Sequence, residues 1–246
     1  MGTPVEFCVI KPGSQRRRKE CDPSVEIFFK NIKDGNIEAV KDAILSGQVS
    51  VDEYNDNGFT AIHEAACCGH CLIVELLVHL GSKTIDTPCF GYTPLRSAVM
   101  FGHNSTVETL VRLGSKAIDM QGNFSRTPMH SAVDRGPTSV ITLLRLGSKS
   151  IDAVCVNNET PLSSSICDKD TAKTLILLGA DYSKHRDQYR IKCVLMELQR
   201  DGWEELAYET RYAVYFEQSL TDRLLSSCRP FDLDDIIPKQ IPDELD

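Results

Sequence analysis

The chain has 246 residues, of which 41% are hydrophobic and 25% are charged, and its formal net charge is −8 at pH 7. No apolar run approaches the roughly 20 residues that a membrane-spanning helix needs, so we expect no membrane insertion. The acidic balance argues against nucleic acid as the main partner, because nucleic-acid-binding domains present positive surfaces. Together these properties predict a single, elongated, soluble domain.

Residues 1–24 are expected to form a flexible leader. Met1–Ile10 is too short for a secretory signal peptide and contains Glu6, and the basic run follows this stretch instead of preceding it. That run, Arg16–Lys19, is similar to a short nuclear import signal, but four basic residues also fit a solvated tail. We therefore expect an intracellular, cytoplasmic protein, with nuclear entry as an open alternative.

The next segment, residues 25–57, predicts two helices at Val25–Lys33 and Ile37–Leu45. Gly35 and Gly47 precede Gly69 and Gly81 by 34 residues each, which is close to the spacing of the motifs further along the chain. We interpret the segment as a degenerate first repeat whose polar outer side caps the units after it.

Two motifs then recur at a nearly constant interval. The first begins at Thr60, Thr93, Thr127 and Thr160, with intervals of 33, 34 and 33 residues; the second is Gly-Ser-Lys-x-Ile-Asp, beginning at Gly81, Gly114 and Gly147, 33 residues apart. A fixed period in this range indicates stacked supersecondary units. A stack of this kind offers a continuous recognition surface, which favours binding over catalysis.

The residues of each unit predict a pair of helices. A threonine at the start can cap a helix N-terminus, and Pro94, Pro128 and Pro161 stand at the first helical position, where a missing N–H does no harm. A glycine follows the last apolar residue of each second helix, as expected at a helix end. Apolar residues at i, i+3 and i+4 in these second helices predict a buried stripe that only a neighbouring unit can cover.

Thr-Pro-Leu-His and its variants resemble the start of the ankyrin repeat, and the resemblance covers about 25–187. It implies an all-α ankyrin solenoid, with a β-turn and two antiparallel helices in each repeat. The expected units are about 25–57, 58–90, 91–124, 125–157 and 158–187. Arg96 and Ser163 replace the histidine and Asn158 replaces a turn glycine, so we expect irregular geometry in the second and fourth full units.

The family resemblance implies that a partner protein binds the concave face, which the turn tips and the first helices line. Aromatic residues, methionine and arginine are typical of interface centres. The predicted partner-binding residues are Phe59, Phe90, Tyr92, Met100, Phe101, Phe124, Arg126 and Arg135. The other positions expected on this face are Asn57, Glu64, Cys68, Ser97, Ser131, Asp134, Asn157, Glu159, Ser164 and Asp168. The alternative is that the phenylalanines pack only on neighbouring turns.

We expect no enzyme activity, no cofactor and no metal. The family resemblance implies that His63 and His130 brace the turns by hydrogen bonds. Cys67, Cys68, His70 and Cys71 lie close together in the sequence, but they occur on a repeat turn and lack a second ligand pair at zinc-site spacing. The ten cysteines fit thiols in a reducing compartment better than a disulfide scaffold.

Residues 188–228 predict a helical C-terminal extension, with helices at Ile191–Gln199 and Trp203–Ser227, and residues 229–246 predict an acidic, proline-containing tail. Leu224–Arg229 and Ile236–Leu245 resemble boxes by which some ankyrin proteins recruit a ubiquitin ligase, which would make the chain a substrate-recognition adaptor. The unusual Gly-Ser-Lys-x-Ile-Asp motif is similar to arrays that intracellular bacteria inject into host cells, so a secreted effector is a further alternative. We expect a monomer.

Overall fold

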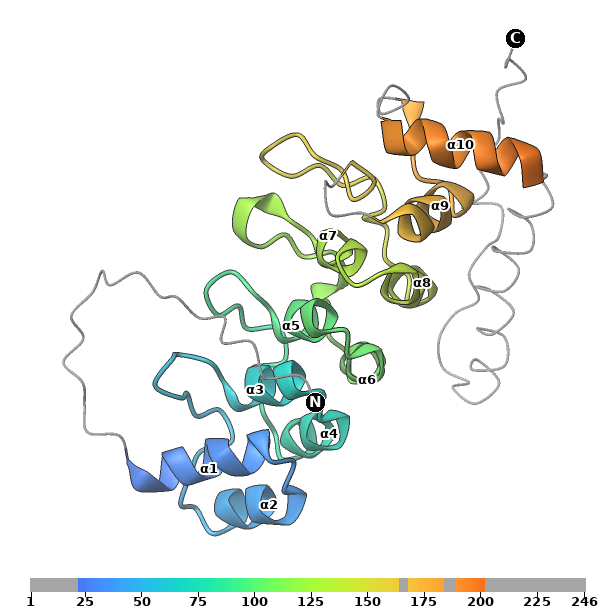
Figure 1. The fold of residues 1–246 in the computed structure, drawn as a ribbon. Coiled ribbons are helices and arrows are strands. Elements are labelled where there is room, and N and C mark those ends of the chain that lie inside the picture. The colour runs from blue at the N-terminus through green and yellow to red at the C-terminus, as the bar shows by residue number, and fades with distance from the viewer. Residues whose placement is uncertain (1–21, 164–167, 184–188, 202–246) are drawn as a thin grey trace.

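The computed structural model describes residues 22–163, 168–183 and 189–201. From α1 to α8 their α-helices form successive antiparallel pairs that stack side by side into an elongated array, and α9 and α10 continue the stack (Figure 1). The helices are α1 (Pro23–Lys33), α2 (Ile37–Leu45), α3 (Ala61–Cys68), α4 (Cys71–His79), α5 (Pro94–Phe101), α6 (Asn104–Arg112), α7 (Pro128–Val133), α8 (Pro137–Arg145), α9 (Lys169–Leu177) and α10 (Tyr189–Asp201). The described fold is all-α, as predicted; α2 lies at the range expected for the first repeat, whereas α1 begins two residues earlier than expected, at Pro23, because Asp22 caps it.

The helix starts follow from the side chains at their N-termini. The hydroxyls of Thr60 and Thr93 accept hydrogen bonds from the backbone N–H three residues later, in the first turns of α3 and α5. Asn36 and Asp168 cap α2 and α9 in the same way, and the Asp22 carboxylate caps α1 by accepting from the Ser24 N–H, two residues later. Each cap satisfies a backbone donor that has no partner inside the helix.

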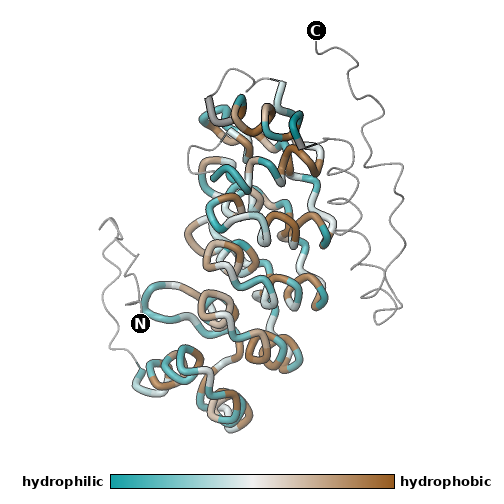
Figure 2. Tube along the Cα trace, turned by 45° about the vertical axis from the view of Figure 1, so that its right-hand side comes forward, coloured by the Kyte–Doolittle hydropathy of each residue, from teal (hydrophilic) through white to brown (hydrophobic). Residues whose placement is uncertain are grey.

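A continuous core runs between the stacked pairs and holds the array together. Every pair from α1 to α10 supplies fully buried side chains, and hydrophobic residues recur along the whole stack (Figure 2). The large buried members include Phe28, Ile62, Leu77, Leu95, Leu110, Met129, Leu143, Leu175 and Ile191. Because each buried stripe is covered by the next unit, the units are stable only as a stack.

The Gly-Ser-Lys-x-Ile-Asp motif forms a ladder between repeats. The carboxylate of Asp86 accepts hydrogen bonds from the Ser115 hydroxyl at 2.5 Å and from the Lys116 backbone N–H at 2.9 Å. The same pair of contacts joins Asp52 to Ser82 and Lys83, and Asp119 to Ser148 and Lys149. The aspartate that ends one copy of the motif therefore accepts a hydrogen bond from the serine at the second position of the next copy.

A second ladder joins the loops between paired helices. The Nε2–H of His103 donates to the carbonyl of Cys67 at 3.0 Å, and His70 donates to the carbonyl of Lys33 at the same distance. Each imidazole lies against the glycine of the preceding repeat, so that a Cβ added to Gly69 would come within 2.6 Å of the His103 ring. Glycine is therefore required at these positions for two reasons: the backbone is left-handed, and the imidazole of the next repeat packs directly against the Cα.

The third full repeat corrects the alignment that the sequence suggests. The sequence equates Gly136-Pro137 with Gly102-His103, but Gly136 is the N-cap of α8, as His103 is of α6, and the two helices lie 33 residues apart. The turn before α7 has one extra residue and α7 is shorter, with six residues against eight in α5. Arg135 therefore takes the place of Gly102.

In the second full unit α5 is regular, with the same length, threonine cap and left-handed glycine C-cap as α3, but Phe90 in the loop ahead of it is left-handed, with φ 52°. In the fourth unit, residues 161–163 form a turn and 164–167 lie outside the described residues. Asn158 adopts a left-handed conformation there, with φ 60°. The third unit, for which no irregularity was predicted, contains left-handed Phe124 and Ser125.

The C-terminal extension begins with α10, which covers the predicted Ile191–Gln199 and buries Ile191, Val194 and Leu198 against the stack. The predicted helix at Trp203–Ser227, the acidic tail, the two box-like segments, Ser164 and Arg16–Lys19 lie outside the described residues. None of the described helices combines the length and apolar character that crossing a membrane requires.

Candidate partner-binding surface

Four loops project from the helical stack on one side, three of them ahead of α3, α5 and α7 and the fourth ahead of the turn at residues 161–163 (Figure 1). In the second, Cys89 and Tyr92 exchange both backbone hydrogen bonds, at 2.8 and 3.0 Å, and close a tight hairpin around Phe90 and Gly91. The neighbouring loops close through Asn55 to Phe59, Gly122 to Arg126 and Cys155 to Glu159. The loops are therefore ordered supports for the residues at their tips.

Histidines from the preceding repeat clamp two of these loops. The Nε2 of His63 lies 3.0 Å from the Tyr92 carbonyl oxygen, and Nδ1 lies 2.8 Å from the Thr60 hydroxyl. Burial lowers the pKa of His63 to about 4, although the hydrogen bond to Tyr92 opposes the shift. At neutral pH the ring is thus uncharged, with Nε2–H donating to the carbonyl and Nδ1 accepting from the hydroxyl.

His130 repeats the arrangement one unit further along, with Nε2 3.2 Å from the Glu159 carbonyl oxygen and Nδ1 accepting from the Thr127 backbone N–H. Burial lowers its pKa as well, with Arg126 and Arg96 adding to the effect. In both histidines, each ring nitrogen is therefore engaged in a hydrogen bond. Their geometry is that of braces for the loops, as the sequence comparison with the family implies.

The loop tips are linked to one another as well as to the helices. The Asn123 side-chain amide donates to the Phe90 carbonyl at 2.5 Å, and the Val156 backbone N–H donates to the Phe124 carbonyl at 3.0 Å. The rings of Phe59 and Phe90 meet edge to face, with centroids 5.7 Å apart. We call the residues Phe59, Phe90, Phe124 and Val156 the tip row. Contacts therefore connect loops that are a full repeat apart in sequence.

The two phenylalanines in the middle of the tip row are both exposed and left-handed. Phe90 is 58% exposed with φ 52°, and Phe124 is 71% exposed with φ 58°. Bulky side chains rarely adopt positive φ, and such a residue costs about 1–3 kcal/mol that the surrounding structure must offset. Most of each ring stays in solvent, so burial offsets little of this cost, although the Phe90 ring contacts Phe59.

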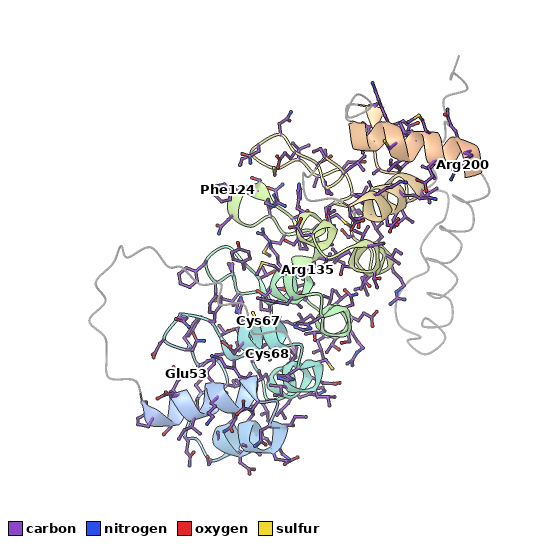
Figure 3. The ribbon with its side chains drawn as sticks, in the orientation of Figure 1. Glu53, Cys67, Cys68, Phe124, Arg135 and Arg200 are labelled. Carbon is purple, nitrogen blue, oxygen red and sulfur yellow. The ribbon has the colours of Figure 1, made fainter. Side chains whose placement is uncertain are left out.

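The structure divides the predicted binding residues into two groups. Phe59, Phe90, Tyr92, Phe124 and Arg126 lie on the projecting loops, whereas Met100 and Phe101 end α5 and Arg135 follows α7. A helix of eight residues separates the groups by roughly 10 Å. Figure 3 shows the separation, with Phe124 on a projecting loop and Arg135 beside the helices.

The individual environments of these residues differ. Phe101 is exposed and its ring stacks against His103, while Met100 is half-buried. Arg126 is half-buried, donates to the His130 carbonyl at 3.3 Å and lies 4.0 Å from the Asp134 carboxylate. Arg135 is exposed. Whether any of these residues contacts a partner stays a prediction.

Ser97 and Ser131 correct the prediction of an exposed first-helix face, because both are buried. Ser131 accepts a hydrogen bond from the Arg96 guanidinium of the neighbouring unit at 3.4 Å. The prediction also missed exposed apolar residues on the loops, namely Tyr54, Met120, Val154 and Val156. Their position next to the turn of each repeat could have indicated that these residues are exposed on the loops.

The cysteines and histidine that are close in sequence span the end of α3, with Cys67 and Cys68, and the start of α4, with His70 as its N-cap and Cys71 as its first residue. His70 is committed to the Lys33 carbonyl. In the part of the chain that the structure describes, no three His, Cys, Asp or Glu side chains come together in a way that could hold a metal ion.

Comparisons with known proteins match the repeat architecture. The family described as "Ankyrin repeats (3 copies)" matches residues 28–121. The chain is also similar to protein phosphatase 1 regulatory subunit 27 of Mus musculus, with 34% identity over 83 residues, which are 32% of this chain and 54% of that protein. For the Homo sapiens protein the identity is 34% over 76 residues, which are 29% of this chain and 49% of that protein. The chain thus spans about half the length of the curated relatives it matches.

Proposed function

We propose that this ankyrin-repeat protein is a non-enzymatic binding module that holds a partner protein against its projecting loops, with the tip row as the centre of contact. Ankyrin repeats are protein-interaction modules, and the similarity to a phosphatase regulatory subunit is consistent with a binding role. The proposal concerns where on the array the partner binds.

One observation carries the proposal: adjacent loops both present an exposed phenylalanine in a strained, left-handed conformation. Strain of this kind concentrates at functional sites, where the surrounding structure holds it. Exposed aromatic rings held rigidly lose little conformational freedom on binding, which makes them effective anchors.

The test compares three proteins as baits in affinity capture followed by mass spectrometry. They are the wild type, the double variant Phe90→Asn with Phe124→Asn, and the control Leu72→Gln. Asparagine tolerates the left-handed conformation, so the double variant keeps the loops intact. Leu72 is also exposed and apolar but lies on α4, in the helix row away from the loops. We expect proteins retained by the wild type and by Leu72→Gln to be lost with the double variant.

Equal retention by all three baits, with the double variant still folded, would show that the tip row is not the binding surface. Protein phosphatase 1 is the first named partner to add to the assay, because the similar proteins carry it in their names.

The adaptor alternative rests on residues 224–229 and 236–245, outside the described part of the chain. Its test is copurification of elongin or Skp-type adaptors. The effector alternative is tested by a translocation reporter fused to the chain.

A further inference from the structure

The second full repeat buries a cation where its neighbours bury a neutral ring. Arg96 stands at the position that His63 and His130 occupy in the flanking units, three residues after the capping threonine. It is only 4% exposed. Burial lowers the pKa of Arg96, but an arginine guanidinium stays charged in proteins whereas a buried histidine does not. This point of the array therefore holds a full positive charge.

The groups that contact the Arg96 guanidinium are all neutral. Nε donates to the Ser131 hydroxyl and Nη1 donates to the Gly91 carbonyl, both at 3.4 Å, and the guanidinium lies over the Tyr92 ring, 4.6 Å from its centroid. Among residues 22–163, 168–183 and 189–201, no carboxylate forms an ion pair with Arg96. A buried charge without a counter-charge is costly, so the arrangement calls for an explanation beyond stability.

The nearest cation makes the imbalance larger. Arg126 acts on Arg96 as a like charge, and both act on His130 in the same sense. Arg126 has one neighbouring carboxylate, Asp134, at a loose 4.0 Å. Burial raises the pKa of Asp134, although Arg126 and Arg135 both act to lower it.

A second acid, Glu159, lies near His130 and accepts from the Cys155 thiol at 3.9 Å. Three arginines, one in α5 and one on each side of α7, therefore outnumber the two carboxylates of Asp134 and Glu159.

This local excess contrasts with the rest of the protein. The whole chain carries a formal charge of −8, yet Arg96, Arg126 and Arg135 outnumber the neighbouring acids Asp134 and Glu159 by one. Charges further apart than about 8–10 Å are largely screened at physiological salt, so a ligand that contacts this region responds to the local arginines more than to the net charge. The exposed rings of Phe90 and Phe124 lie on the loops ahead of α5 and α7.

We propose that Arg96, Arg126 and Arg135 form an acid-recognition site, and that the partner binds as an acidic peptide segment with an apolar residue. The carboxylate of an Asp or Glu side chain contacts Arg126, with Arg96 behind it supplying uncompensated charge and Arg135 adding positive charge from the other end of α7. The apolar residue packs on the tip row. This inference rests on the proposed function and adds the chemistry of the partner to it.

The test uses the full chain to select binders from a random peptide library, followed by fluorescence anisotropy with the peptides so obtained. Variants Arg126→Gln and Arg96→His probe the acid-recognition site. Histidine is the matched replacement at position 96, because the array itself carries histidine at the two equivalent positions, hydrogen-bonded to the capping threonine. The double variant Phe90→Asn with Phe124→Asn probes the tip row separately.

We expect selected peptides to be enriched in Asp and Glu and to bind more weakly as salt is raised. Arg126→Gln should weaken them at least tenfold or so, the range for losing a charge-assisted contact at an interface. Arg96→His should weaken peptide binding less than Arg126→Gln does. Peptides in which Gln replaces Glu should bind Arg96→His and the wild type equally well.

Selected peptides without acidic enrichment, or unaffected by Arg126→Gln, would overturn this inference. If those peptides still needed Phe90 and Phe124, the proposed function would stand. Selected peptides that bind the phenylalanine double variant as tightly as the wild type would contradict the tip row as the binding surface. They would also contradict the acid-recognition site, because this inference rests on the proposed function.

Discussion

Replacing Asp86 by Ala should remove one step of the ladder that joins the repeats. The Asp86 carboxylate accepts from the Ser115 hydroxyl at 2.5 Å and from the Lys116 N–H at 2.9 Å, and Ser115 is buried. Hydrogen bonds to a charged group contribute about 1.5–3 kcal/mol each, and the bond to Lys116 is exposed to competing water. We expect the variant to lower the free energy of unfolding by about 3 kcal/mol.

Urea unfolding followed by far-ultraviolet circular dichroism measures this loss. Asp86→Asn keeps one acceptor oxygen and should cost about half as much, near 1–2 kcal/mol. Lys116→Ala is the matched control, because the Lys116 side chain is exposed and only its backbone N–H takes part, so its effect should stay within about 0.5 kcal/mol. The reasoning is refuted if Asp86→Ala is no more destabilising than Lys116→Ala.

Three further predictions concern the braces, the glycines and the tip row. The pKa of His63 is about 4 in the folded chain against 6.5 for the free side chain, so the unfolded chain binds the proton first as the pH falls. Stability from the neutral ring is therefore fully present above pH 6.5 and is lost between pH 6.5 and 4, by about 3 kcal/mol. Urea midpoints of wild type and His63→Gln should converge over this window, and a constant difference would contradict the assignment. Gly69→Ala should destabilise by about 1–3 kcal/mol more than Gly102→Ala, since both have φ near 78° but only Gly69 meets an imidazole. Equal losses in thermal unfolding would exclude the stacking role. Phe124→Asn should raise the free energy of unfolding by about 1 kcal/mol by relieving left-handed strain, and a loss of stability would mean that the ring contributes to the fold.

The sequence predicted the fold because its signals are local. The capping threonines, the proline after Thr93 and the glycine after α5 each determine one helix end, and all act within a few residues. The periodic motifs then indicate that the same unit is stacked. Neither step needs knowledge of distant contacts.

The ladder contacts could not be predicted in the same way. Asp86 and Ser115 are 29 residues apart, and a period shows that both recur without showing that they meet. The sequence also did not reveal that Arg135 is equivalent to Gly102. The turn before α7 has an extra residue and α7 is shorter, so the two changes together leave the 33-residue spacing of the second motif unchanged.

Burial on the first helices was the part of the site that the sequence left open. Ser97 and Ser131 have polar side chains at positions that are exposed on an isolated helix, but the adjacent repeats cover them. The strained backbone at Phe90 and Phe124 likewise follows from hairpin closure and the extra turn residue, which no residue type reveals. The binding residues themselves stay predictions.

The most direct test of the binding surface is site-specific photo-crosslinking. A photoreactive phenylalanine analogue is placed at Phe90, at Phe124 or at the control position Leu72, and each protein is irradiated with a partner identified by affinity capture. We predict crosslinks to the same partner from positions 90 and 124 and none from position 72. Crosslinking from position 72, with none from either loop position, would contradict the account.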